Sequence, residues 1–130
     1  MLLAAVLAAE DVSFVLVGSA AWYLHGHRIP VADIDAVPAS DGGNLTRLHA
    51  ALAVMVPDGR VPAMRRFGTA DVVSVRTSYG GLDCLRGWGR RNWGKLQSGA
   101  RLVQVHDAGV MVASATTVTA LRRRHTRTGS

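Results

Sequence analysis

The sequence predicts an α+β fold in which helices pack on a mixed sheet of about five strands. The chain of 130 residues buries roughly two-thirds of its unfolded surface, enough for one core, so residues 1–130 are expected to form a single domain. The composition, 48% apolar and 18% charged, is that of a globular protein. Short apolar runs of strand length alternate with longer segments of helical spacing, which favours a sheet covered by helices.

The first quarter of the chain predicts a helix, a strand and a second, shorter helix. Residues 2–9 are strong helix formers without a breaker, so this helix is expected to end near Asp11. Residues 14–17 form an apolar run that is typical of a strand buried on both faces. Ser19 is a candidate N-cap for the short helix, and Gly26 is its expected stop.

The next segments predict a half-open strand, a covering helix and an irregular connection. Residues 33–37 alternate polar and apolar side chains, which indicates a strand with one open face that ends at Pro38. A helix should follow the turn and cap residues that begin at Asp41. Its apolar positions are Leu45, Leu48, Leu52 and Val54. Residues 56–70 contain two Pro and two Gly, so an irregular connection with at most one helical turn is expected.

The remaining segments predict two hairpins and a helical tail. The hairpins comprise residues 72–75 with 82–85 and residues 102–105 with 110–112. Between them, residues 87–94 are expected to form a basic, Trp-containing loop that leads into a short helix. The tail from Thr116 is expected to be helical and is rich in Arg.

The charge is unevenly distributed. The net charge is +6, but residues 1–57 hold two basic and five acidic side chains, whereas residues 58–130 hold thirteen basic and four acidic ones. Such an asymmetry favours a polyanionic partner, either a nucleotide or a nucleic acid. An arginine-rich solvated surface explains it equally well, so charge alone does not decide.

The sequence favours a soluble, cytoplasmic protein without a membrane partner. Cys84 is the single cysteine, which excludes an internal disulfide and fits a reducing compartment. The apolar N-terminus lacks the basic residues of a signal peptide, since the first basic residue is Arg28. The longest other apolar stretch, residues 13–24, is shorter than the roughly 20 residues that a membrane span needs.

The segment with most chemical content joins a Gly-Ser turn to an Asp-x-Asp strand. Asp33 and Asp35 should point to the same side of their strand, roughly 6 to 7 Å apart along the backbone. Two carboxylates at this spacing can together hold a hard divalent cation such as magnesium. Gly18 and Ser19 offer N–H groups, a hydroxyl and a helix N-terminus, which suit phosphate oxygens. Either feature alone also fits a structural role, as a helix cap or a solvated strand face.

The order of these features resembles the nucleotidyltransferases of the polymerase beta superfamily, whose signature is a Gly-Ser or Gly-Gly turn followed by Asp-x-Asp. The matching segments are LVGSAAWYLHG (16–26), PVADIDAVP (30–38) and NLTRLHAAL (44–52). The long spacer between the turn and the carboxylates is similar to that of the branch that contains abortive-infection and toxin–antitoxin nucleotidyltransferases. The resemblance extends from about residue 12 to the end of the chain.

The resemblance implies a third carboxylate on a later strand, and Asp83 fits this position. Asp83 is polar on an otherwise apolar run, and a cap or a salt bridge to Arg76 or Arg86 is the alternative explanation. By resemblance, Asp33, Asp35 and Asp83 would be the catalytic residues and would bind Mg²⁺ (or Mn²⁺). Their ions would activate an acceptor hydroxyl and hold the triphosphate.

The resemblance also implies the substrates. Gly18 and Ser19, with Arg122, would bind a nucleoside triphosphate, and its nucleoside monophosphate would be transferred to an acceptor hydroxyl. The acceptor would be an RNA end, such as that of tRNA, or a protein side chain. The setting would be a toxin–antitoxin or phage-defence system, with a cognate antitoxin or other protein as partner.

Two departures from the toxin-like pattern keep a second interpretation open. Arg122 stands where those members carry a Lys, and the chain ends at Ser130, near the place of a further acidic residue. Arg cannot act as a compact ammonium or lose a proton, so the exchange is not neutral. The alternative is a catalytically degenerate module that binds RNA or a protein through residues 86–95 and 122–127.

Two smaller motifs allow a functional or a structural interpretation. Trp88 and Trp93 lie among basic residues and could stack on bases or pack against the sheet. His25 and His27 could be zinc ligands, but a chain with one Cys and no second His pair favours surface histidines.

Overall fold

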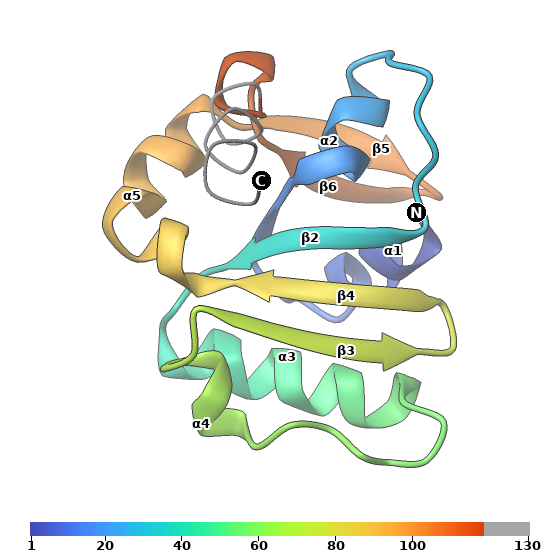
Figure 1. Cartoon of the computed structure of the whole chain (residues 1–130), viewed down its shortest axis with the longest axis vertical. Coiled ribbons are helices and arrows are strands. Elements are labelled where there is room, and N and C mark those ends of the chain that lie inside the picture. The colour runs from blue at the N-terminus through green and yellow to red at the C-terminus, as the bar shows by residue number, and fades with distance from the viewer. Residues whose placement is uncertain (119–130) are drawn as a thin grey trace, which may run out of the picture.

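The computed structural model describes residues 1–118, and residues 87–92 by their backbone alone. These residues form a mixed sheet with helices packed on it (Figure 1), so the predicted α+β fold is confirmed. The strands are β1 (Phe14–Val17), β2 (Asp33–Pro38), β3 (Val72–Thr77), β4 (Gly80–Leu85), β5 (Arg101–Val105) and β6 (Ala108–Val112). The helices are α1 (Leu2–Ala9), α2 (Gly18–Leu24), α3 (Gly42–Met55), α4 (Met64–Phe67) and α5 (Arg86–Gly99).

The sheet has six strands, one more than expected, in the order β3-β4-β2-β1-β6-β5. Both predicted hairpins are present as the antiparallel pairs β3-β4 and β5-β6. The central strand β1 is antiparallel to β2 and parallel to β6, and β2 is parallel to β4. The two hairpins therefore lie at opposite edges of the sheet, with β1 and β2 between them.

Side chains alternate along β2, β3 and β4, so this half of the sheet has two different faces. One face, which we call the core face, is formed by the buried side chains Ile34, Ala36, Val73, Val75, Leu82 and Cys84. The other, which we call the open face, carries Asp33, Asp35, Ser74, Arg76 and Asp83, all exposed or half-buried. The same strands thus provide both a core and a polar surface.

Helices contribute the rest of the core. Leu3 and Leu7 of α1 and Leu48 and Leu52 of α3 are almost fully buried. Val54 was expected on the buried side of α3 but is 88% exposed, because the helical spacing that links positions 45, 48 and 52 continues to position 55. Met55 is buried in its place.

Asn44 fixes the start of α3 against the sheet. Its side chain is fully buried, accepts from the Ser13 N–H at 2.7 Å, and donates to the carbonyls of Ser13 and Ala39 at 2.8 Å each. Asp41 caps the helix by accepting from the Asn44 N–H at 3.0 Å, which confirms its predicted role. Because every polar atom is paired, this buried amide ties α3 to the ends of β1 and β2.

Two further local expectations were wrong. Ser19 is not the N-cap of α2, because the helix already begins at Gly18 with Val17 in the N-cap position. Residues 87–94 do not form a loop but belong to α5, which is continuous over Arg86–Gly99. Leu96 of α5 is 1% exposed and Trp93 is half-buried, so packing on the sheet outweighs the low helix propensity of the glycines.

Candidate functional site on the open face

The strand register brings two of the predicted carboxylates side by side. Asp35 on β2 is paired with Asp83 on the neighbouring parallel strand β4, and both side chains point to the open face. Adjacent strands lie about 4.8 Å apart, so these two carboxylates are close neighbours although 48 residues separate them in the chain. Asp33 lies one step further along β2 on the same face, opposite Gly81.

Gly18 lies directly against Asp35, which joins the predicted phosphate-binding turn to the carboxylates. The backbone of Gly18 is left-handed, with φ of 64°, and a Cβ placed there would overlap the carboxylate of Asp35. Only glycine satisfies both conditions without strain. The turn after β1 is therefore in direct contact with Asp35, and Ser19 follows at the start of α2, half-buried.

Asp33 is held by a second glycine and an arginine. Its Oδ1 accepts from Arg76 Nη1 at 3.1 Å and from the Gly81 N–H at 3.2 Å. The register places Arg76, Gly81 and Asp33 in one row across β3, β4 and β2. Because Gly81 has no side chain, the guanidinium can cross β4 to reach Asp33. A Cβ on Gly81 would lie 2.5 Å from Asp33 Oδ1 and 2.7 Å from Arg76 Nη1.

Asp83 has a different partner from the ones expected. Its Oδ1 accepts from the hydroxyl of Ser74 at 2.6 Å, and Ser74 is its register neighbour on β3. The proposed salt bridge to Arg76 or Arg86 was wrong, since Arg76 pairs with Asp33 and Arg86 donates to the Thr69 carbonyl at 3.4 Å. A second row, Ser74, Asp83 and Asp35, thus runs parallel to the first.

The fit of a metal ion to this face can be judged from the donors. Asp35 and Asp83 provide hard carboxylate oxygens side by side, which suit a divalent cation such as magnesium. Within residues 1–118, however, no three Asp, Glu, His or Cys side chains are gathered as a complete metal site. Asp33 is engaged by Arg76 instead. The pair therefore fits a cation, whereas the role of Asp33 as a ligand stays a prediction.

The remaining candidate residues lie elsewhere or outside the described part. Arg122, the expected triphosphate contact, and the basic segment 122–127 lie outside the described residues. Of the two histidines, His25 is half-buried with Nε2 at 2.7 Å from the Ala113 carbonyl, and His27 is exposed and stacks on Trp22 with ring centroids 4.1 Å apart. The prediction of a surface residue thus holds for His27 but not fully for His25.

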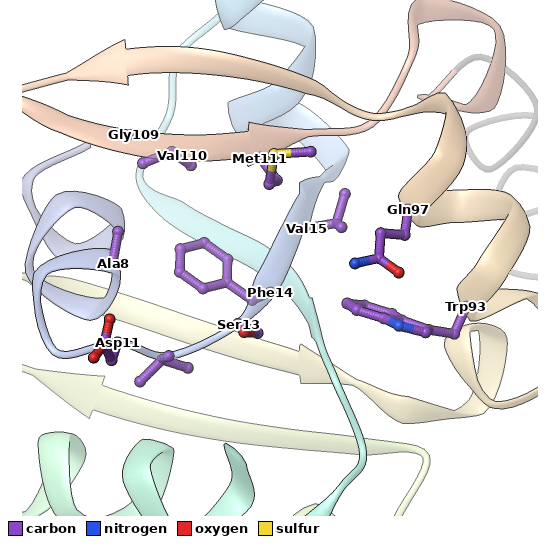
Figure 2. Close-up of a pocket in the computed structure, with 11 residues that line it drawn as sticks. Ala8, Asp11, Ser13, Phe14, Val15, Trp93, Gln97, Gly109, Val110 and Met111 are labelled. Carbon is purple, nitrogen blue, oxygen red and sulfur yellow. The ribbon is translucent and has the colours of Figure 1, made fainter.

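A cavity of about 210 Å³ lies at the far end of β1 from Gly18 (Figure 2). It is bounded by the end of α1, the start of β1, β6 and α5. Trp93 and Gln97 of α5 face Phe14, Val15 and Met111 across it. Trp93 is packed against the core, as the structural interpretation of this residue expected. The cavity is separate from the carboxylates, which lie toward the opposite end of β1.

Sequence reasoning missed two members of the site. Position 81 falls between the predicted strands 72–75 and 82–85, where a turn is expected, and Arg76 is expected only as an alternative partner for Asp83. The available signal was the hairpin itself: a two-residue turn at Ser78 and Tyr79 places Arg76 opposite Gly81.

Comparison with known proteins supports the fold. No protein-family model matches the chain, and no curated protein matches its sequence. Among solved structures, it is similar to a crystal structure from Thermotoga maritima that is described as a candidate nucleotidyltransferase. The TM-score is 0.64 with 15% sequence identity, over 93% of this chain and 81% of that one. The chain therefore has a nucleotidyltransferase-like α+β fold, in which the two carboxylate rows occupy the open face.

No helix among the described residues is long and apolar enough to cross a membrane.

Proposed function

We propose that this protein is a magnesium-dependent nucleotidyltransferase that moves a nucleoside monophosphate from a nucleoside triphosphate to an acceptor hydroxyl. The observation that carries the proposal is the placement of Asp35 beside Asp83, directly against the Gly18 turn. The likeness of the fold to a candidate nucleotidyltransferase is in agreement with it.

In this proposal, separate residues bind the metal, bind the phosphates and accept the proton. Asp35 and Asp83, together with Asp33 when it is released from Arg76, would hold magnesium. When bound, the metal supplies positive charge that stabilises the phosphates and lowers the pKa of a hydroxyl. The N–H groups of Gly18 and Ser19 would donate to the β and γ phosphates. Asp83, half-buried and bonded to Ser74, would accept the proton of the acceptor hydroxyl.

The reaction balances without a further reactant. The acceptor oxygen forms a new bond to the α-phosphorus, and the bond from that phosphorus to the bridging α–β oxygen breaks. Pyrophosphate leaves with the bonding electron pair, and the acceptor proton passes to Asp83 and then to water. The positioning of two substrates in line, rather than covalent chemistry by the protein, supplies the rate enhancement.

The acceptor in this proposal is an RNA end such as that of tRNA, with a protein side chain as the other candidate. The excess of basic residues after position 58 favours RNA, because phosphate contacts dominate the affinity of proteins for nucleic acids. The proposed setting is a toxin–antitoxin or phage-defence system in the cytoplasm, with a cognate protein partner.

The direct test is transfer of label. The protein is incubated with Mg²⁺, each α-labelled nucleoside triphosphate in turn, and total RNA, and labelled RNA and labelled protein are both measured. We expect Asp35→Asn to reduce transfer by at least about 100-fold, because a metal site that loses a carboxylate no longer positions the triphosphate. The matched control is Asp107→Asn, which removes an exposed carboxylate from the β5-β6 turn, where Asn tolerates the left-handed backbone.

The outcomes separate the two functions. Asp35→Asn with wild-type transfer would exclude Asp35 from catalysis. The absence of transfer by the wild-type protein to RNA and to protein favours the degenerate binding module, for which the engagement of Asp33 by Arg76 is the supporting observation.

A further inference from the structure

Arg76 has an unusual position for a surface arginine. It lies on the edge strand β3, and its side chain is 80% exposed, yet it is directed across Gly81 onto Asp33, whose side chain is 46% exposed. The contact is an ion pair of 3.1 Å from Nη1 to Oδ1. The same carboxylate oxygen also accepts from the Gly81 N–H.

Stability alone does not account for this arrangement. Ion pairs between exposed side chains contribute little to folding, and this pair lies on the open face rather than in the core. A guanidinium has five N–H donors, of which one is directed to Asp33 here. Arg76 lies on the same face of the sheet as Asp35 and Asp83. A planar cation with further donors beside these carboxylates is suited to a bidentate contact with phosphate.

Arg76 and a divalent cation also compete for the same group. Both are positively charged, and both seek the carboxylate of Asp33. A cation bound beside Asp35 and Asp83 would repel the guanidinium and offer Asp33 a stronger partner. The guanidinium, once released, would be close to any anion that is bound at this face.

We infer that Arg76 is a polyphosphate-binding residue that exchanges partners: it neutralises Asp33 in the ligand-free protein and binds the triphosphate when a divalent cation takes Asp33. The inference rests on the proposed function, because it uses the same carboxylates. It adds a residue on β3 to the substrate-binding set. It also explains why Gly81, the position between Arg76 and Asp33, has no side chain.

The inference predicts effects of opposite sign on two ligands. Arg76→Ala removes the competing cation from Asp33, so the protein should bind Mn²⁺ alone about threefold more tightly. The same variant loses a charged donor to phosphate, so it should bind inorganic tripolyphosphate in saturating Mg²⁺ about tenfold more weakly. Arg76→Lys keeps the charge but not the planar fork. It should therefore leave Mn²⁺ affinity close to that of the wild type while weakening tripolyphosphate binding.

The experiment compares four proteins by calorimetric titration with these two probes: the wild type, Arg76→Ala, Arg76→Lys and Arg60→Ala. Arg60→Ala is the matched control, because it removes an equally exposed arginine from an Asp58 pair of 3.7 Å and changes the net charge by the same amount. Arg60→Ala should bind both Mn²⁺ and tripolyphosphate with affinities close to those of the wild type. Thermal melts without ligand establish that all four proteins are folded.

The outcomes are distinguishable. A wild type that binds both probes, with an Arg76→Ala variant that binds them unchanged, overturns the inference and leaves the proposed function standing. Weaker binding of both probes by Arg76→Ala also overturns it, because Arg76 would then position Asp33 rather than compete for it. A wild type that binds neither probe overturns the inference and the proposed function together.

Discussion

The open face and the core face of the β2, β3 and β4 strands are made by alternate residues of the same three segments. On the core face every side chain is apolar and buried. Such a side chain can be replaced by another apolar one of similar volume at little cost in stability. On the open face each polar side chain has a specific partner: Ser74 bonds to Asp83, and Arg76 bonds to Asp33. Residues for stability and residues for candidate chemistry in this protein are therefore separated by a single step along a strand.

The largest expected effect lies on the core face. Leu82 is 1% exposed and lies between Gly81 and Asp83 in β4. Leu82→Ala should lower the free energy of unfolding by about 2 to 5 kcal/mol, because it removes a buried side chain and leaves a cavity. Urea denaturation measures this change. A loss below about 1 kcal/mol would mean that the core face is not closely packed at its centre.

The free energy of unfolding should also depend on pH, because the buried Cys84 of the core face can titrate. Burial raises the pKa of its thiol to about 12, and the neighbouring Asp83 carboxylate adds to the increase. The unfolded thiol has a pKa of 9.0, so above this pH the unfolded state binds fewer protons than the folded one. The free energy of unfolding should therefore fall by up to about 1.4 kcal/mol per pH unit between pH 9 and 12 and stay unaffected by this group below pH 9.

The control for this pH dependence is Cys84→Ala, which retains the titration of every other group. Subtracting its pH profile from that of the wild type isolates the thiol. The same burial predicts that a thiol reagent at pH 8 labels the native protein only as fast as the protein unfolds, since the thiolate is the reactive form. Rapid labelling of the folded protein would contradict the burial of Cys84.

A substitution at Gly81 tests how closely Arg76 and Asp33 are packed over this glycine on the open face. Gly81→Ala should destabilise the protein by no more than about 1 kcal/mol, because the atoms in the way belong to the ends of two exposed side chains, Asp33 and Arg76. The matched control is Gly94→Ala in α5, where an added Cβ meets open space and should stabilise the helix by about 0.4 to 1 kcal/mol. Chemical denaturation compares both with the wild type.

A large loss of stability in Gly81→Ala would change our view of the row that Arg76, Gly81 and Asp33 form. A loss of several kcal/mol in Gly81→Ala would show that the row of Arg76, Gly81 and Asp33 is rigid and cannot shift. In that case, the exchange of partners inferred for Arg76 would require a larger rearrangement than the structure indicates.

The sequence predicted the fold well where local pattern determines structure. The period-two alternation at 33–37 placed both aspartates on one face, and the apolar run at 14–17 located the buried central strand. The pairing of Asp35 with Asp83 depends on a parallel register between strands that are far apart in the chain. Because the two strands are parallel, no hairpin turn joins them and fixes which residues pair.

The remaining misses have related causes. The α5 helix contains Gly87, Gly89 and Gly94, which argue against a helix locally, and only packing of its apolar side on the sheet explains it. The contact between Arg76 and Asp33 crosses an intervening strand, so it follows from the absence of a side chain at Gly81 rather than from the arginine itself. The predicted roles of Gly18, Ser19 and the three aspartates in catalysis stay predictions.

The smallest expected effect lies on the open face, at Ser74. Its hydroxyl donates to Asp83 at 2.6 Å, but the serine is exposed and water can replace the bond. Ser74→Ala should therefore change the free energy of unfolding by no more than about 0.5 kcal/mol, which urea denaturation can measure against the Leu82→Ala change on the neighbouring strand β4. A double-mutant cycle with Asp83→Asn should give a coupling energy below about 1 kcal/mol. A larger coupling would mean that the carboxylate is shielded from solvent and that the open face contributes to folding as the core face does.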